Sequence, residues 1–362
     1  MNHLSPKQLF SRRKALQIPM AAAGGALAFG APPARKDEHD PDNIKIATLI
    51  NMRSATDDML LFLKQIGLRW VHFDFGDDGS FETIKGTQER LARYGLKIHC
   101  AFHACYRSIR LQLGRPGRDQ DIETFIAFVK NLGRLGIYSS KIDWHPGNTY
   151  TTKMIESPRG YKAREFSVDD FRKNVEKQLY ERVYTAEDIW ATYTYFIKAV
   201  LPVAEKADVR LALHPDDPPL PMMNGVAKLF THYDGIKRAD EIAGKSKYWG
   251  LTLCVGTWSE GGDKMGKDVF GMIDDFGARG KIFAVHFRNV SSPLPRFHET
   301  LHDDGYLDMY QVMRAFRKAK CNGSFIPDHY PGLSGDANRR AVEAYSIAYM
   351  RSLLRRVNED IG

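Results

Sequence analysis

The chain has 362 residues, of which 43% are hydrophobic and 27% charged, a balance typical of folded globular proteins and not of disordered chains. This length is long for an ordinary domain but normal for a single α/β barrel. The formal net charge is +8, and half of it comes from residues 1–34, which contain no acidic residue. No cluster of Lys and Arg interleaved with aromatic residues is present, so the composition does not favour nucleic acid as a partner. The mild positive balance suits a small anionic ligand.

The N-terminal residues resemble an export signal. Arg12 and Arg13 precede an apolar run rich in Ala and Gly at 18–29, and small residues follow it. Paired arginines are typical of the twin-arginine route, so residues 1–34 are predicted to be a signal segment and 35–43 a linker. The apolar run is too short and too rich in glycine for a stable membrane span. We therefore expect an exported, periplasmic protein. A retained N-terminal anchor, or a cytoplasmic protein with a signal that does not function, are the alternatives.

Short apolar runs alternate with longer helical patterns from residue 44 to residue 358. Strands are predicted at 44–50, 70–75, 97–102, 138–144, 209–214, 250–254, 282–287 and 324–328. Helices are predicted at 56–66, 81–94, 121–135, 186–206, 225–242, 267–276, 309–318 and 337–357. Eight strand–helix pairs in strict alternation predict an α/β protein with a single (β/α)8 TIM-barrel domain after the signal.

Two further features bear on this fold. No G-x-G-x-x-G motif follows the first predicted strand, which argues against a dinucleotide-binding fold. The stretch 148–184 is an insertion after the fourth strand. Long loops that follow barrel strands usually lie at the active-site face, so we expect this insertion there.

Four consecutive predicted strands end in, or close to, a residue that can bind a metal ion. These residues are His214, Cys254, His286 and Asp328. Taken singly, each has an ordinary explanation as a packed cysteine, a loop histidine or a helix-capping aspartate. In a barrel, however, the carboxyl ends of the strands converge on one rim. Two imidazoles, a thiolate and a carboxylate at one point predict a site for a divalent transition metal such as Mn, Fe, Co or Zn.

Further polar residues surround these candidates. Asp216 and Asp217 lie in a proline-rich loop that holds them in place for substrate binding or forms a plain turn. Arg288 shares the strand face of the candidate ligand two positions before it and suits a substrate carboxylate, the alternative being an ordinary ion pair. His298 is a candidate for proton transfer near neutral pH, and His302 in the same loop is a candidate substrate contact.

Other His and Cys residues give weaker indications. His103 and His145 follow the third and fourth strands and are candidates for the same rim. Cys100 and Cys105 are near each other in sequence, so in an oxidising compartment they are candidates for a disulfide, or they are free thiols. Four cysteines in all are too few and too scattered for a disulfide scaffold.

The order of the motifs resembles the mannonate dehydratase family, whose members have a xylose-isomerase-like barrel. The motifs are His-Pro-Asp-Asp-Pro-Pro at 214–219, Cys-Val-Gly at 254–256, His-Phe-Arg at 286–288, Phe-His-Glu at 297–299, Leu-Asp-Met-Tyr at 307–310 and Pro-Asp-His at 327–329. The resemblance is strong over roughly 196–345 and looser over 44–150.

The resemblance implies a function and residue roles. It implies dehydration of D-mannonate to 2-keto-3-deoxy-D-gluconate, with a divalent metal, Mn2+ or Fe2+, held by the four candidate ligands. His329 is implied to act as an acid or base beside the metal, and Tyr345 to take part in proton transfer. A metal bound to the substrate stabilises the enediolate that forms when a base removes the C2 proton, while an acid protonates the leaving C3 hydroxyl.

One departure from the family pattern concerns substrate recognition. Where the family usually has Arg before Pro-Asp-His, this chain has Ile326. Either Arg288 or another cation takes the place of that arginine, or the substrate is a different sugar acid. A sugar isomerase or epimerase on the same barrel and a non-catalytic exported barrel are the alternative functions, and a homo-oligomer is compatible with all of them.

Overall fold

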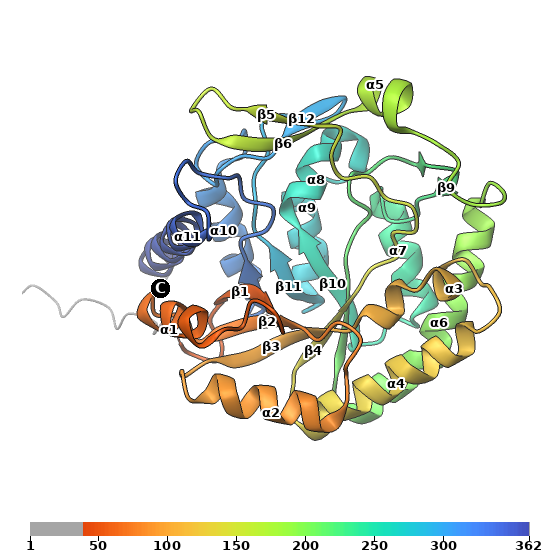
Figure 1. The fold of residues 1–362 in the computed structure, drawn as a ribbon, viewed down its shortest axis with the longest axis horizontal. Coiled ribbons are helices and arrows are strands. Elements are labelled where there is room, and N and C mark those ends of the chain that lie inside the picture. Colours follow the sequence, from red (N-terminus) through yellow and green to blue (C-terminus); the bar gives the residue numbers. More distant parts are fainter. Residues whose placement is uncertain (1–38, 362) are drawn as a thin grey trace, which may run out of the picture. The chain divides into compact units, whose positions relative to one another are not determined.

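The computed structural model describes residues 39–361, and eight parallel strands within that range close into a barrel (Figure 1). The hydrogen-bonded order around the barrel is β1, β13, β11, β10, β7, β4, β3, β2. The predicted (β/α)8 fold is therefore confirmed. The strands are β1 (Lys45–Asn51), β2 (Trp70–Asp74), β3 (Lys97–Phe102), β4 (Ser139–Ile142), β7 (Arg210–Leu213), β10 (Trp249–Cys254), β11 (Ile282–His286) and β13 (Ser324–Ile326).

One main helix follows each barrel strand. These helices are α1 (Asp57–Gln65), α2 (Phe81–Ala92), α4 (Arg118–Arg134), α6 (Ala186–Ala207), α7 (Tyr233–Ile242), α9 (Val269–Met272) with its π-helical continuation η4 (Ile273–Gly277), α10 (Met309–Lys318) and α11 (Arg340–Ile361). Shorter helices lie in the loops, namely η1 (Ala104–Arg107), α3 (Ile109–Gln112), α5 (Val168–Asp170), η2 (Phe171–Val175), α8 (Val255–Gly261) and η3 (Gly262–Met265). Among the described residues, no helix has the length and apolar character needed to cross a membrane.

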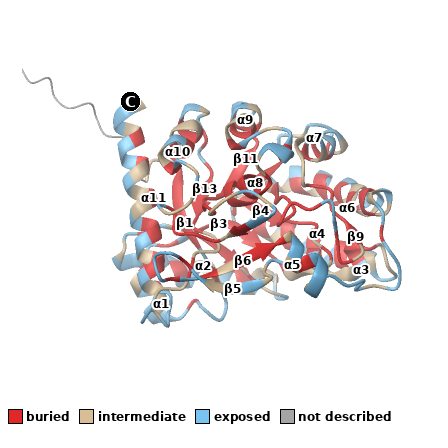
Figure 2. Ribbon diagram, turned by 90° about the horizontal axis from the view of Figure 1, so that it is seen from above, coloured by how far each residue is buried: buried red, intermediate tan, exposed pale blue. Residues whose placement is uncertain are grey.

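Local sequence explains where the 22-residue helix α6 begins and ends. Thr185 caps the N-terminus of α6 by accepting from the Asp188 backbone amide, and the Asp188 side chain accepts from the Thr185 amide in return. Asp208 ends the helix in the left-handed conformation. The buried face of α6 packs through Phe196 on Phe125 of α4, at a ring-centroid distance of 5.4 Å. Figure 2 shows this division generally, with buried strands and helices exposed on their outer faces.

Strand register determines which side chains face the inside of the barrel. Partners in neighbouring parallel strands point to the same side of a sheet. Ala284 pairs with Ser324, and Ser324 pairs with Lys45, so these residues share the inner face. Leu49 is on the same face of β1 as Lys45, and its partner His72 donates to or accepts from Ser324 Oγ at 2.6 Å. Leu49 is nevertheless 43% exposed, so the inner face is open to solvent at the carboxyl end of the strands.

The predicted insertion at 148–184 contains a hairpin that joins a second loop. Its strands β5 (Lys153–Glu156) and β6 (Lys162–Ser167) pair with β12 (Arg296–His298), which lies in the loop after β11. The three strands lie together at one side of the barrel in Figure 1. The insertion is thereby tied to the loop that carries the predicted histidines.

One expectation about local structure is wrong, and the alternative left open for Cys100 and Cys105 is decided in favour of free thiols. The helix predicted at 225–242 begins only at Tyr233, because Asn224 and Gly225 adopt positive φ values of 51° and 79° and connect the short hairpin strands β8 (Met222–Met223) and β9 (Val226–Ala227). Cys100 and Cys105 are free thiols, since Cys100 is inside β3 and Cys105 lies in the loop beyond that strand's end. The predicted signal at 1–34 and residues 35–38 of the predicted linker lie outside the described residues.

Candidate active site

Three predicted ligands converge at the carboxyl end of the barrel. One ligating atom each from His214, Cys254 and His286 lies within 4.8 Å of the other two, and all three residues are buried. The His214 Nδ1–H donates to the Pro215 carbonyl at 2.7 Å, which leaves its Nε2 lone pair directed at His286 Nδ1, 3.1 Å away. Backbone hydrogen bonding by one imidazole nitrogen is a common way of orienting the other toward a metal.

Asp328, the fourth predicted ligand, adjoins this group. Its Oδ2 lies 3.2 Å from His286 Nδ1. Burial lowers the pKa of His214 and of His286, so both imidazoles are neutral at physiological pH. Although burial alone would raise the pKa of Asp328, His286 and His329 hold it well below its ordinary value. Two neutral imidazoles and an ionised carboxylate present more lone pairs than protons to one another, which is the environment that a cation fits.

The cysteine also fits a metal. Cys254 caps the N-terminus of α8, where the Thr257 amide donates to its sulfur at 3.4 Å. Burial raises the pKa of Cys254 to about 12, so the thiol keeps its proton until a metal displaces it. In addition, His286 Nε2 is buried and has no hydrogen-bond partner among the described residues. These four residues are therefore the ones that would hold a divalent ion.

Arg288 lies buried beside the cluster and is surrounded by acidic groups. Its guanidinium contacts Asp217 at 2.8 Å, Glu260 at 2.7 Å and Glu299 at 3.2 Å, and its Nε lies 3.5 Å from Asp328 Oδ2. Burial and the nearby Asp217 raise the pKa of Glu260 well above its ordinary value, so that carboxyl is protonated. Arg288 keeps the pKa of Asp217 low despite the burial. Asp217 and Asp328 thus place at least two negative charges against one guanidinium, and a nearby divalent cation would balance the excess.

His329 lies at the edge of the cluster with its ring held in place. Its Nδ1 is 3.0 Å from Glu299 Oε1, and its Nε2 is 3.5 Å from Asp328 Oδ2. The backbone of His329 has a φ of 53°, a sparsely populated conformation for a residue other than glycine. Tyr150, from the insertion, lies edge-on to the His329 ring at a centroid distance of 6.2 Å. Strand end, loop and insertion therefore meet at this histidine.

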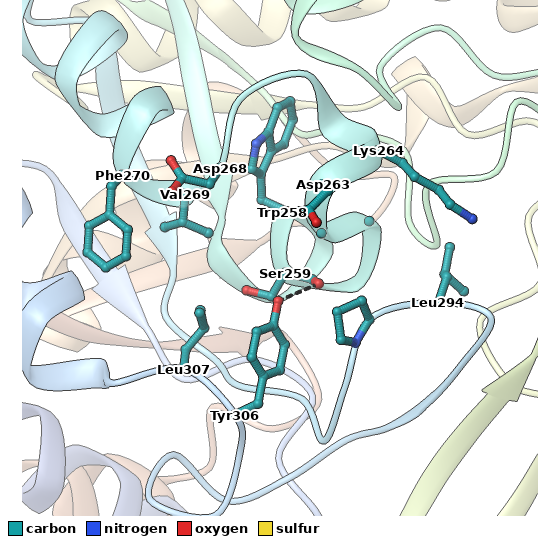
Figure 3. A pocket seen from close by; sticks show the side chains of 13 residues that line it. Trp258, Ser259, Asp263, Lys264, Asp268, Val269, Phe270, Leu294, Tyr306 and Leu307 are labelled. Carbon is teal, nitrogen blue, oxygen red and sulfur yellow. Dashed lines mark hydrogen bonds between the residues drawn. The ribbon is translucent and has the colours of Figure 1, made fainter.

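A pocket of about 350 Å³ opens next to His329 and carries positive charge. We call it the cationic pocket; its lining includes Met154, Lys162, Arg164, His329, Tyr330 and Arg339. Three of these side chains are Lys or Arg, and none is acidic. A second hollow of about 370 Å³ lies elsewhere, between α8, η3 and the loop after β11 (Figure 3). There the Tyr306 hydroxyl donates to the Ser259 carbonyl at 2.7 Å, and the predicted site residues are absent from its lining.

The sequence from residue 152 to residue 359, more than half of the chain, matches the family model described as D-mannonate dehydratase (UxuA). The chain belongs to the D-mannonate dehydratase family. Mannonate dehydratase of Streptococcus suis (strain 05ZYH33) is 29% identical over 257 residues, which cover 63% of this chain and 68% of the relative. Mannonate dehydratase of Thermotoga neapolitana is 28% identical over 308 residues, covering 75% and 84% respectively.

Solved structures agree with this family membership. The crystal structure of mannonate dehydratase from Streptococcus suis serotype 2 has a TM-score of 0.79 at 26% identity and covers 88% of this chain and 96% of that chain. A xylose isomerase domain protein from Planctomyces limnophilus has a TM-score of 0.58 at 9% identity, with 88% and 99% covered, so that likeness concerns the fold alone.

Four predicted substrate contacts have other partners in this dehydratase family member. Arg288 and Asp217 form an ion pair with each other at 2.8 Å. Asp216 accepts from the backbone amides of residues 229 and 230 at 3.0 and 2.9 Å, and thereby holds its loop closed. His302 shares a hydrogen bond with the Phe287 carbonyl and packs between Phe287 and Tyr349 of α11, in the helix layer. The substrate-binding roles of these four residues stay predictions.

Two residues that were predicted to transfer protons do not contact the cluster. Tyr345 lies on α11, where its hydroxyl interacts with Arg159 and Asp303 and not with the cluster. His298 lies in β12, and among the described residues no hydrogen bond or ion pair joins its ring to the cluster. The adjacent Glu299 makes the contacts instead. His103 caps η1 and His145 contacts the Pro215 carbonyl at 2.7 Å, so only the second of these two weaker candidates reaches the cluster's loop.

Three side chains near the cluster, namely Glu260, Tyr150 and Lys141, are not among the residues predicted from the sequence. Glu260 is buried in α8 against the guanidinium of Arg288 and carries no local sequence signal. Tyr150 belongs to an insertion whose path is set by tertiary contacts. Lys141 did have a signal, because it is a charged residue inside the otherwise apolar and small-residue strand β4, where it is buried.

The ligand assignment predicts a loss of metal on changing the cysteine. Cys254→Ser should lower metal affinity by roughly tenfold or more, at least the cost of losing an outer-shell partner. Cys100→Ser is the matched control, since Cys100 is also a buried barrel-strand thiol but lies away from the cluster. Metal-to-protein ratios after equilibrium dialysis measure the effect. Equal metal content in both variants would remove Cys254 from the ligand set.

The charge network around Arg288 predicts a stability effect. Arg288→Met leaves buried carboxylates without a cation and should lower the free energy of unfolding by about 3–5 kcal/mol. Arg296→Met is the control, because Arg296 pairs with Glu165 but its side chain is 52% exposed, so its loss should cost about 0–1 kcal/mol. Urea unfolding of the metal-free proteins measures both. Equal losses in the two variants would contradict the structural role of Arg288.

Proposed function

We propose that this chain is a hydro-lyase that removes water from D-mannonate to give 2-keto-3-deoxy-D-gluconate, and that Mn2+ or Fe2+ binds at His214, Cys254, His286 and Asp328. The observation that carries the proposal is the convergence of these four groups beside His329 in a chain of the D-mannonate dehydratase family. A bound divalent ion supplies stabilisation of the negative charge that develops on the substrate carboxylate as the C2 proton leaves.

His329 is the base in this proposal. Dehydration requires a group that removes the proton from C2 of the sugar acid. With Glu299 accepting from Nδ1–H, the lone pair of His329 is on Nε2, the nitrogen that faces Asp328 and the cluster. The carboxylate therefore fixes the tautomer and the orientation that proton abstraction needs.

Tyr150 is the acid in this proposal, whereas the family resemblance gave Tyr345 a part in proton transfer. The Tyr150 hydroxyl lies 3.3 Å from His145 Nδ1, and its ring adjoins His329. The Tyr150 side chain is 39% exposed, and partial desolvation together with the carboxylates of Asp143 and Asp217 raises its pKa, so the phenol is protonated and can donate to the leaving C3 hydroxyl. Tyr345 has no such neighbours, because its partners are Arg159 and Asp303.

The cationic pocket is the proposed path for the substrate. Lys162, Arg164 and Arg339 surround an opening that has His329 in its wall. A sugar acid carries one negative charge at neutral pH, so these side chains raise its local concentration near the cluster. We also infer from residues 1–34 that the protein is exported, in which case the sugar acids that it meets are outside the cytoplasm.

The reaction and the role of His329 are tested together. The metal-loaded protein is incubated with D-mannonate and other aldonates, and products are identified by mass. Loss of water with formation of a 2-keto-3-deoxy acid supports the proposal, whereas an isomeric product of unchanged mass would replace it with isomerisation or epimerisation. His329→Asn should lower kcat by roughly 10²–10⁴-fold with metal content near that of the wild type. Loss of metal in step with activity would place His329 among the ligands.

The two tyrosines are compared directly. Tyr150→Phe should lower kcat by roughly 10²-fold or more, because it removes the proposed proton donor. Tyr345→Phe, which removes a hydroxyl that does not contact the cluster, should leave kcat within about twofold of wild type, as expected for a surface change away from the site. Steady-state kinetics with the most active aldonate measure both. The reverse order of effects would return the acid role to Tyr345.

A further inference from the structure

Lys141 is a buried cation on the inner face of the barrel, one inner-face position below the metal cluster. It lies in β4 opposite Ala212 of β7. The next inner-face positions on these two strands are Asp143 and His214, and the His214 amide donates to the residue 142 carbonyl at 2.9 Å. Lys141 is only 8% exposed. Its side chain therefore rises from within the barrel toward the cluster.

The ammonium group of Lys141 lacks a hydrogen-bonding partner. Within residues 39–361, its Nζ makes no hydrogen bond, and its nearest carboxylate oxygen, Asp143 Oδ2, is 3.8 Å away. That oxygen is already held by Arg107 Nη2 at 2.6 Å and by the Tyr106 hydroxyl at 3.2 Å. The Phe102 ring lies 5.3 Å from Nζ, measured to its centroid, and offers a cation–π contact but no hydrogen-bond acceptor. The three donors of this largely buried ammonium are therefore available to a further acceptor.

Other buried lysines show that this is a particular feature of Lys141. Lys45, at the opposite end of the barrel, donates to the Pro41 and Asn322 carbonyls, both at 2.7 Å. Lys228 donates to the Pro146 carbonyl at 2.5 Å. Lys281 is paired with a buried aspartate, Asp240. Each of these ammonium groups is hydrogen-bonded or paired at short range within the protein, whereas among the described residues Lys141 has only the more distant Asp143 and the Phe102 ring.

The surroundings of Lys141 favour a bound ligand over a structural partner. The inner face is solvent-accessible at the carboxyl end, as the exposure of Leu49 shows. The charge of Lys141 is among the causes that lower the pKa of His72, His214 and His286, which places it close to the cluster. The barrel order puts β13 opposite β4, and there the inner-face residue is the fully buried and apolar Ile326. The cation for an anionic ligand is thus on β4.

We propose that Lys141 binds the carboxylate of the sugar-acid substrate and makes the site prefer acids over neutral polyols. This inference rests on the proposed dehydratase function. The ammonium supplies three donors to a group that offers four lone pairs, and the low polarity of the barrel interior strengthens the charge-assisted hydrogen bonds. Lys141 thereby acts as a specificity-determining residue that does not take part in proton transfer.

The test compares an acid with its neutral counterpart. Metal-loaded proteins that carry His329→Asn, with and without Lys141→Met, are titrated calorimetrically with D-mannonate and with D-mannitol, so that binding is measured without turnover. D-mannitol has a hydroxymethyl group in place of the carboxylate. Lys141→Met should lose roughly 10²-fold or more in affinity for mannonate, since loss of one partner of a buried charge pair has an effect of this order. Mannitol affinity should stay within about threefold, a shift comparable to that of a near-neutral substitution. Lys141→Arg should restore part of the mannonate affinity.

A second variant separates this role from simple neutralisation of Asp143. Lys141→Met is repeated in an Asp143→Asn background, which also provides a folded protein if the uncompensated aspartate destabilises the single variant. If Lys141 binds substrate, the same loss of mannonate affinity appears in both backgrounds. If mannonate and mannitol weaken equally, or if the loss disappears in the Asp143→Asn background, the proposal is overturned.

The outcomes also distinguish this proposal from the proposed function. A wild type that dehydrates mannonate while Lys141→Met keeps the wild-type KM would refute the role of Lys141 alone. A wild type that binds mannonate through Lys141 but releases no water would refute the dehydratase function and keep Lys141 as a carboxylate site. Product mass and binding affinity are therefore measured on the same preparations.

Discussion

The closed parallel sheet is the constraint on which the site depends. Because partners in neighbouring strands share a face, the pairing of Cys254 with His286 fixes both side chains on the inner face at the same level. His214 joins them from β7 and Asp328 from just beyond β13, without any loop having to find a special path. A shift of one residue in any of these strands would turn its ligand into the helix layer. The hydrogen bonds between strands that hold the barrel together therefore also set the positions of these four side chains.

The cations around this group are of two kinds, a buried arginine next to it and exposed side chains farther out. Arg288 is buried, is enclosed by carboxylates and holds them near the cluster. Outside it, Lys162 and Arg164 of the inserted hairpin face an open pocket beside His329. Buried cations of the first kind act on local structure and on the pKa of their partners, whereas exposed cations of the second kind act on encounter with an anion. Arg288 and Arg164 therefore have different roles, the first in local structure and the second in attracting an anion.

The sequence predicts what is local and periodic. The eight strands follow from apolar runs, and the polar residue at the end of four of them, such as Cys254, marks the cluster. The sequence does not predict which way a loop side chain faces, because that depends on contacts with distant parts of the chain. His302 packs on Tyr349 of α11, and Asp216 accepts from the backbone amides of residues 229 and 230. Nor does the sequence show that Tyr150, which lies in the insertion, contacts His329. The tyrosine that the family resemblance indicated for proton transfer was Tyr345, in the last helix.

Ile326 and Lys141 show how the departure from the family pattern changes the position of the positive charge inside the barrel. A long cation at position 326 would extend inward from β13, whereas here β13 contributes an apolar side chain at 0% exposure. An anionic substrate still needs a counter-charge in a low-dielectric interior, since an unpaired carboxylate there is strongly disfavoured. Lys141 stands on the opposite strand with no hydrogen-bond acceptor among the described residues. Moving the cation across the barrel keeps the charge balance of the bound state and changes the direction from which the carboxylate is held. The sugar hydroxyls are then presented to the cluster from a different angle, which is where a change of substrate among sugar acids would arise.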